Sequence, residues 1–456
     1  MKTARGINVG CKTAFRAKCK ALGRTAESNR DGFKVLQSLL DQLGSTKGVH
    51  TDVEWEKAGF FKRCFVMLPG GVKVATRSPN KAVSLDGSHL SGVFKGVILT
   101  ITTMDANNRI NIVAFAVVRR ENEKSYKYLL TQAKKSKQIT KFLNNKTTTC
   151  FTDGQNGVDA AVAELMPLAA LQNCLEHLLR EAGRVGKVGK QHAYSAAKST
   201  TKAMFDNFMG LLRGVDPDVH DKLNAVSHKL WAHYAGRKDV CWGQVTTNSA
   251  ESANSLLLEL RRLPVYYLVR GTILLMTKRL YDASELKKDD LEQISTPFAT
   301  EHFKKAIELS RTLTTEPLGD PVFLVSDGKV GSPQQYRTSV VWTTSKSGTP
   351  PPTFECSCGV PQKMQLPCSH VVATVQAQKR MKESLSLVNK RFKLTRYRRL
   401  ATHPINLPVW DELKKDPSKK PPRMVKRLDG KAISTKRTTR IRSTGEERAR
   451  KKRKTR

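Results

Sequence analysis

Residues 82–118 read AVSLDGSHLSGVFKGVILTITTMDANNRINIVAFAVV, and this stretch decides the fold of the central part of the chain. It contains three largely apolar runs rich in β-branched residues, at 82–86, 96–102 and 110–118. Runs of this length and composition, separated by turn residues, predict three β-strands joined as an antiparallel meander. The first of these strands ends on an acid, Asp86.

The pattern continues with a predicted helix over 123–135 and a fourth strand over 147–152 that ends at Asp153. Three strands, a helix and a strand ending in an acid are the order of an RNase H-like α/β core. In that fold the fourth strand lies beside the first, so Asp86 and Asp153 are expected to meet at one edge of the sheet. A helix, a short strand and a further helix follow, at 158–165, 168–173 and from residue 175.

A third carboxylate, Glu251, stands in the stretch NSAES at 248–252 and precedes leucines at helical spacing. Asn248 or Ser249 is a suitable N-cap, which would place Glu251 in the first turn of a helix packed against the sheet. Carboxylates from separate elements supply the hard oxygen ligands that divalent ions need for phosphoryl chemistry. Each acid taken alone is equally well explained as a surface carboxylate or a turn former.

The charge of the chain predicts a polyanionic partner. It carries 80 Lys and Arg against 40 Asp and Glu, a formal charge of +40, and residues 379–456 alone hold 28 Lys and Arg against 7 acids. No apolar run approaches the ~20 residues that span a bilayer, which leaves nucleic acid as the leading partner. The basic run at 448–454 is expected to be disordered and to serve as a nuclear localisation signal, a phosphate-binding arm or a solvating tail.

The cysteines indicate a zinc site. Nine cysteines, most of them scattered, do not suit a disulfide framework and favour a reducing, intracellular compartment. Three of them lie close together and, with one histidine, have the spacing C-x-C-x9-C-x-H: Cys356, Cys358, Cys368 and His370. Three thiolates and an imidazole suffice for a closed, structural tetrahedral Zn²⁺ site.

Five stretches, in this order, resemble the Mutator-like element (MULE) transposases: LDGSHL at 85–90, AFAVV with ENE at 114–118 and 121–123, TDGQNG at 152–157, CLEH at 174–177 and TNSAESANS at 247–255. The resemblance implies a DDE recombinase whose Asp86, Asp153 and Glu251 bind two Mg²⁺ or Mn²⁺ ions. Water would cut DNA at a transposon end, and the 3′ hydroxyl would then attack target DNA. The late Cys/His set is similar to a SWIM zinc finger, a module associated with DNA or protein binding.

Cys174 and His177 of the fourth stretch form a Cys-x-x-His pair with no second pair nearby. A role in the scaffold or in DNA contact and a simple buried Cys with a packed His both remain open. Members of the family often carry an N-terminal zinc-binding domain, whereas about 30 residues precede the first predicted helix here. Either the chain is a truncated copy or it recognises its DNA ends by other means.

The sequence thus predicts a basic N-terminal arm (1–31), a helical lead-in (32–80), a DDE transposase core (81–275) with a helical insertion at about 190–245, a helical connector (276–335), a SWIM zinc finger (336–380) and a basic, largely disordered tail (381–456). The expected function is a nuclear DNA transposase that acts on transposon ends and target DNA, not on membranes. A homo-oligomer and a nuclear import receptor are further candidate partners. The alternatives are a domesticated, non-catalytic DNA-binding or transcription-regulating protein and a nuclease acting on RNA–DNA hybrids.

Overall fold

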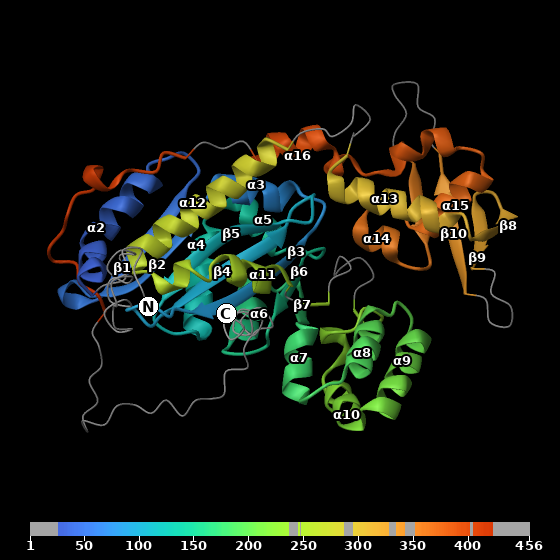
Figure 1. Ribbon diagram of the computed structural model, residues 1–456, viewed down its shortest axis with the longest axis horizontal. Helices are drawn as coiled ribbons and strands as arrows, with labels where there is room; N and C mark the ends of the chain where they lie inside the picture. The colour runs from blue at the N-terminus through green and yellow to red at the C-terminus, as the bar shows by residue number, and fades with distance from the viewer. Residues whose placement is uncertain are drawn as a thin grey trace, which may run out of the picture.

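A computed structural model describes residues 26–236, 245–246, 248–286, 295–327, 334–342, 352–401 and 405–422. The molecule is elongated (Figure 1), with a large sheet and its covering helices at one end and a small sheet with separate helices at the other. Of the predicted basic arm over 1–31, residues 1–25 lie outside the described part.

The large sheet has seven strands in the order β1-β2-β5-β4-β3-β6-β7. The strands are β1 (His50–Trp55), β2 (Phe61–Met67), β3 (Ala82–His89), β4 (Val97–Met104), β5 (Ile110–Val118), β6 (Thr149–Thr152) and β7 (Ala170–Asn173). The predicted antiparallel meander β3-β4-β5 is confirmed, and β3 pairs parallel with β6 as its order along the chain predicts. Strands β6 and β7 are also parallel. The sheet is therefore mixed.

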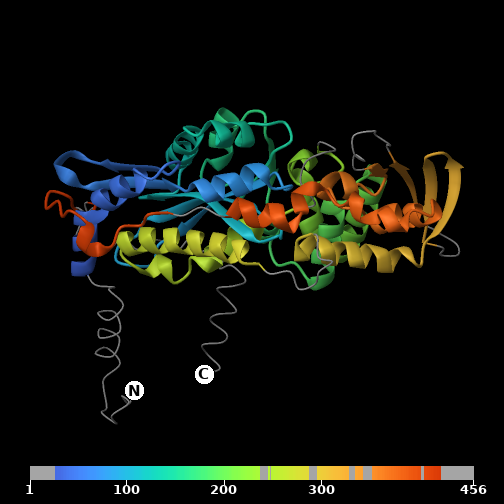
Figure 2. The ribbon, with the colours of Figure 1, turned by 90° about the horizontal axis from the view of Figure 1, so that it is seen from above.

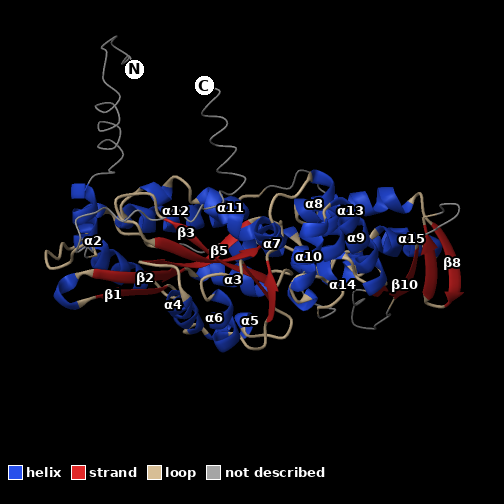
Figure 3. Ribbon diagram, turned by 90° about the horizontal axis from the view of Figure 1, so that it is seen from below, coloured by secondary structure: helices blue, strands red, loops and turns tan. Residues whose placement is uncertain are grey.

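Helices cover both faces of this sheet (Figure 3). On one face lie α3 (Pro69–Arg77), α4 (Glu123–Lys134), α5 (Lys137–Leu143) and α6 (Val158–Leu165); on the other lie α2 (Ala26–Gly44), α11 (Asn248–Leu256) and α12 (Val265–Ser284). Because side chains alternate along a strand, Leu85 of β3 packs in the core under α4 to α6, whereas its neighbour Asp86 faces α11.

The lead-in over 32–80 was expected to be helical, and this prediction is wrong for its middle part. After α2 the chain forms β1 and β2, which extend the sheet through the pairing of β2 with β5. All six residues of β1 are half-buried, and its sequence HTDVEW mixes polar and apolar side chains. Tertiary pairing, not a strong apolar run, makes this segment a strand.

The insertion is helical in its described part, in agreement with the sequence. It contains α8 (Lys187–Lys198), α9 (Lys202–Val215) and α10 (Pro217–Ala225), and α7 (Leu175–Ala182), the helix predicted from residue 175, precedes it. These helices form a small core of their own around Trp231 and Phe205. Figure 1 shows them as a separate group beside β7.

The far end of the molecule holds the small sheet, with strand order β11-β10-β9-β8. Its elements are α13 (Pro297–Ser310), β8 (Thr314–Gly319), β9 (Val322–Ser326), β10 (Gln335–Val341), β11 (Thr353–Cys356), α14 (Val360–Met364) and α15 (Ser369–Ala377). The connector over 276–335 is therefore not wholly helical as expected, since β8 and β9 belong to this sheet. Figure 2 shows α13 running along one side of the module.

The tail over 381–456 was expected to be largely disordered, and for its first half the structure differs. Residues 381–401 contain α16 (Leu394–Ala401), where the Tyr397 hydroxyl donates a 2.6 Å hydrogen bond to Asp105. Residues 405–422, here called the C-terminal strap, run back along α2 and pair with the chain before β2 (Figure 2). Residues 423–456 lie outside the described part.

Short 3-10 helices complete the described chain: η1 (Lys57–Gly59), η2 (His228–Leu230), η3 (Leu260–Arg262), η4 (Met381–Leu387), η5 (Lys390–Phe392) and η6 (Trp410–Glu412). Among the described helices, none combines the length and apolar character needed to cross a bilayer.

Candidate functional site

Acidic side chains gather where β3, β5 and β6 end at one edge of the large sheet. Asp86 lies near the end of β3 and Asp153 directly follows β6. Since β3 and β6 run parallel, their carboxyl ends lie at the same edge. This arrangement brings the two carboxylates close enough to interact electrostatically. The charge of Asp153 raises the pKa of Asp86.

Asp86 is buried, with only 8% of its surface exposed. Its Oδ1 accepts a 2.9 Å hydrogen bond from the backbone N–H of Gly87, and its Oδ2 accepts one of 2.6 Å from Nδ2 of Asn254. Burial, followed by repulsion from Asp153 and Glu121, raises the pKa of Asp86 to about 8, although both hydrogen bonds oppose the rise. A cation bound nearby would stabilise the ionised form of this carboxyl group.

Asp153 begins a tight loop between β6 and α6. Its Oδ1 accepts a 3.0 Å hydrogen bond from the backbone N–H of Gln155. Gly154 and Gly157 have φ angles of +75° and +77°, and Asn156 has +55°, so the left-handed backbone turns the chain sharply here. Burial raises the pKa of Asp153 as well. The Asp-Gly pair thus forms a turn and also places the Asp153 carboxylate where it affects the pKa of Asp86.

Glu251 lies on α11, but its side chain is outside the described part of the structure. Asn254, three residues later, holds this helix against Asp86 through the 2.6 Å hydrogen bond. Figure 1 shows α11 lying across the sheet, where it packs over β3 and β4.

A further carboxylate, Glu121, belongs to the same cluster and was not among the predicted site residues. It follows β5, and an ideal Cβ on Gly87 would lie 2.5 Å from its Oε1. The buried Tyr126 donates a 2.7 Å hydrogen bond to Oε1. Burial raises the pKa of Glu121, and the charge of Asp153 adds to the rise. The sequence signal was an acid three residues after the third strand of the meander, which ends at the same edge as Asp86.

The cluster offers surroundings that fit a divalent cation. Three carboxylates, Asp86, Glu121 and Asp153, repel one another electrostatically, and a cation would relieve this repulsion. Thr100 is opposite Asp86 on β4 and is fully buried, and its Oγ1 has no hydrogen-bond partner among the described residues. Within the described chain, however, these acids do not form a group whose ligand atoms all lie within 4.8 Å of one another. In a site for two ions the metals are ~4 Å apart, so the carboxylates that bind them are spread more widely than the ligands of a single ion.

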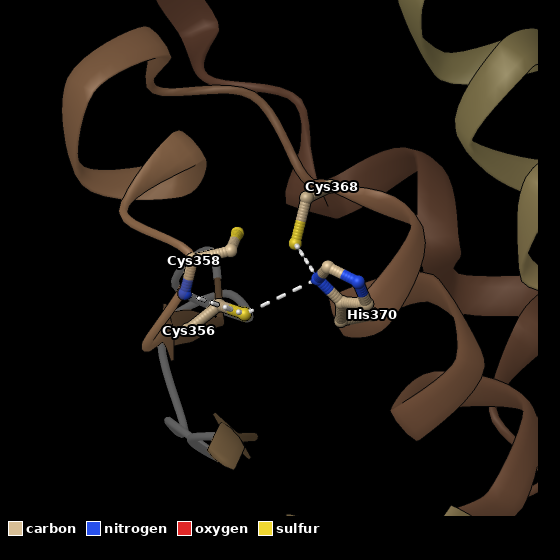
Figure 4. A group of neighbouring side chains, drawn as sticks. All are labelled: Cys356, Cys358, Cys368 and His370. Carbon is tan, nitrogen blue, oxygen red and sulfur yellow. Dashed lines mark hydrogen bonds between the residues drawn. The ribbon is translucent and has the colours of Figure 1, made fainter. Parts of the chain in front are cut away.

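The predicted zinc ligands do form such a group (Figure 4). One ligand atom from each of Cys356, Cys358, Cys368 and His370 lies within 4.8 Å of all the others. His370 Nδ1 is 3.6 Å from Sγ of Cys356 and 3.7 Å from Sγ of Cys368. Spacings of this size suit a tetrahedral ion at the centre of the group.

Two elements carry these ligands. The first pair follows β11 into a turn where Gly359 has a φ of +74°, and the second pair opens α15. The ring of His370 stacks on Tyr336 of β10 with centroids 4.0 Å apart. Hydrogen bonds among the three thiols raise the pKa of Cys356 and Cys368 and lower that of Cys358.

Cys174 and His177 lie at the start of α7. Cys174 is fully buried, and Nδ1 of His177 is buried without a hydrogen-bond partner in the described structure. Burial, and then the charge of Arg180, lower the pKa of His177 to about 4. Among the described residues the pair is not part of a metal-compatible group. The structure thus favours a packed, neutral histidine.

Comparison with known proteins places the acid cluster in a family context. Residues 82–181, which include Asp86, Glu121 and Asp153, match the family model of the MULE transposase domain. Protein FAR1-RELATED SEQUENCE 6 of Arabidopsis thaliana is 24% identical over 135 residues, or 29% of this chain and 18% of that protein. The chain thus aligns with less than a fifth of the length of this curated relative. Its central segment, residues 82–181, is similar to the MULE transposase domain.

Proposed function

We propose that this chain is a DDE-type DNA transposase of the Mutator-like group, which cleaves and joins DNA strands with divalent metal ions. Its large domain would be an RNase H-like core, consistent with the β3-β4-β5-α4-β6 order and the parallel pairing of β3 with β6. The observation that carries the proposal is the convergence of Asp86 and Asp153 at one edge of the sheet, with α11 bonded to Asp86 through Asn254.

Asp86, Asp153 and Glu251 would hold two Mg²⁺ or Mn²⁺ ions. When bound, such ions activate the attacking oxygen and stabilise charge on the leaving oxygen at phosphorus. The protein contributes position: Asn254 fixes Oδ2 of Asp86, and the Gly87 N–H fixes Oδ1. Glu121, anchored by Tyr126, adds negative charge beside Asp86 and so strengthens the attraction for cations.

The remaining parts of the chain would support DNA binding. Cys356, Cys358, Cys368 and His370 would bind one structural Zn²⁺ ion and form a SWIM-type zinc finger. The charge of +40 supplies general affinity for phosphate, and the basic C-terminal residues suit nuclear import.

DNA cleavage with purified protein tests the proposal. The full chain is incubated with labelled DNA carrying the ends of its element and with Mg²⁺ or Mn²⁺, and the products are examined for 3′ hydroxyl ends. Asp86→Ala and Asp153→Ala should each abolish cleavage, whereas the exposed Glu308→Ala on α13 should not. Cleavage by Asp86→Ala at the parental rate would overturn the assignment of the site. DNA binding by the parent protein without any turnover would support the non-catalytic alternative, a domesticated DNA-binding protein.

A further inference from the structure

A basic groove lies beside the acid cluster. It is an open hollow of about 840 Å³ between the strands β1 and β2, the end of β5 and the helix α4. Six cationic side chains and only two carboxylates, Glu54 and Glu56, line it. The cations are Lys62, Arg63, Arg119, Arg120, Lys124 and Lys127. Positive charge in a hollow attracts a polyanion more strongly than the same charge on a flat surface.

Some of these cations are held rigidly in place. The guanidinium of Arg63 lies 3.8 Å from the ring centroid of Tyr128 and is 2.6 Å from Oε1 of Glu54. Arg119 lies 2.7 Å from Oε1 of Glu56. Each wall carboxylate therefore already has a partner, and the positive charge exceeds the negative charge in the groove.

Two other cations are available to a ligand. Arg120 and Lys124 are exposed, and within the described residues neither side chain makes an ion pair. They flank the turn between β5 and α4, where the hydroxyl of Ser125 donates a 2.7 Å hydrogen bond to the carbonyl of Arg120. This bond fixes the turn that carries both charges.

The groove is continuous with the acid cluster along the chain. Glu121 directly follows Arg120, and its carboxylate covers Gly87, the neighbour of Asp86. Along the sheet, the groove wall at the end of β5 is two strands from β3 and the wall at β2 is three strands away. With strand spacings of ~4.8 Å, the groove lies about 10 to 14 Å from the Asp86 strand. At ~3.4 Å per nucleotide, this distance corresponds to about three to four nucleotides of a B-form strand.

We propose that this groove binds the sugar-phosphate backbone of the DNA strand about three to four nucleotides from the phosphate that reacts at the acid cluster. This inference rests on the proposed function, since it takes DNA as the substrate. The aromatic ring in the groove, Tyr128, is 5% exposed, lies against Arg63 and donates its hydroxyl to Asp52. A base cannot stack on it, so the groove recognises phosphate and not sequence.

Lysine footprinting of the full protein tests the contact locally, despite the large charge elsewhere in the chain. The protein is acetylated with and without a random-sequence 30-base-pair duplex, in buffer without Mg²⁺, and labelling is read by mass spectrometry. DNA should protect Lys62 and Lys124 severalfold more than Lys141, an exposed lysine on α5. Equal labelling with and without DNA would overturn the proposal. Equal protection by polyglutamate would also overturn it, in favour of an acidic peptide as the ligand.

The salt dependence of DNA binding by a double variant that lacks two groove cations provides a second measurement. Arg120→Ala with Lys124→Ala should reduce the slope of log Kd against log salt concentration by about 2, because each lost phosphate contact removes ~0.9. The matched control, Arg213→Ala with Lys141→Ala, changes one arginine and one lysine on exposed helix positions and should leave the slope unchanged. An unchanged slope in the groove variant contradicts the proposal. Both measurements are independent of cleavage, so normal cleavage by Asp86→Ala would overturn the catalytic proposal without affecting the groove.

Discussion

The side-chain amide of Asn254 donates a 2.6 Å hydrogen bond to Oδ2 of Asp86, a residue 168 positions earlier in the chain. This bond joins α11 to the end of β3. It also favours the ionised form of the Asp86 carboxyl, against the burial that raises its pKa. Asn254 is therefore expected to position Asp86 for metal binding.

Replacing Asn254 by Ala should weaken metal-dependent cleavage by about 10- to 100-fold at limiting Mg²⁺, which is the usual effect of losing a partner of a metal ligand. Part of the rate should return at high Mg²⁺, because the ligand itself remains. The measurement is a titration of cleavage rate against Mg²⁺ concentration. Ser252→Ala, at an exposed position on the same helix, is the control. An unchanged Mg²⁺ titration in Asn254→Ala would show that the bond does not serve the site.

Gly87→Ala should destabilise the protein because of contact with Glu121. The new Cβ would meet Cδ and both carboxylate oxygens of Glu121 at 2.5 to 2.7 Å, and Tyr126 holds that carboxylate in place. Overpacking of this kind costs about 1–3 kcal/mol, measured by urea unfolding. Glu121→Ala should remove most of the cost in the double variant. Strictly additive effects in this double-mutant cycle would contradict the contact.

Much of the large domain is predictable because its central strands are buried on both faces. Strands are predicted clearly by the apolar runs of β3, β4 and β5 and of the segment before Asp153. The order of these strands predicts which acids lie close together. The same reasoning fails for β1, where every residue is half-buried and the sequence is mixed. Glu121 was missed for a different reason. Its approach to Gly87 depends on how the turn after β5 folds back, which spacing along the chain does not reveal.

The cluster of Cys356, Cys358, Cys368 and His370 was predictable because the ligands of a metal have a characteristic local spacing in the sequence. The C-terminal strap was not, because it lies in a tail, residues 381–456, whose overall composition is strongly basic and contains few apolar residues. Those few nevertheless pack: Leu413 is buried in the core under α2, and Trp410 stacks parallel to Tyr267 at 6.2 Å. The average composition of a long tail therefore does not predict a short segment within it that packs against the domain.

Removal of the strap contact at Leu413 should lower stability. Leu413 is 7% exposed, and Leu413→Ala should cost about 2–4 kcal/mol of the free energy of unfolding. Gly59→Ala should act similarly, since its φ is +79° and a Cβ there would lie 2.1 Å from the carbonyl oxygen of Ser418. Urea unfolding measures both. The control Leu385→Ala removes an exposed leucine on η4, and a loss equal to that of Leu413→Ala would contradict the role of the strap.

Zinc should be needed for the folding of the small domain and not for the folding of the large one. One zinc ion per chain is expected by elemental analysis, and Cys368→Ser should abolish it, with loss of the fold around β10 and α15. Tyr336→Leu, which removes the ring stacked on His370, should weaken zinc binding by about 10-fold, as loss of a supporting contact does. Competition with a chromophoric chelator measures the affinity. Full zinc content in Cys368→Ser would contradict the ligand assignment.

His177 should make the protein less stable in acid. Its pKa is lowered from 6.5 to about 4, first by burial and then by Arg180, while Glu181 and Glu176 oppose the change. His177 therefore binds a proton near pH 6.5 in the unfolded chain but only near pH 4 in the folded chain. The free energy of unfolding falls as the pH drops between these values. The difference corresponds to about 3 kcal/mol. The urea midpoint of the parent, measured from pH 7 to 4, should fall more steeply than that of His177→Gln. His192→Gln on α8, which also removes one histidine, should follow the parent. Parallel curves for the parent and His177→Gln would show that His177 does not cause the acid sensitivity.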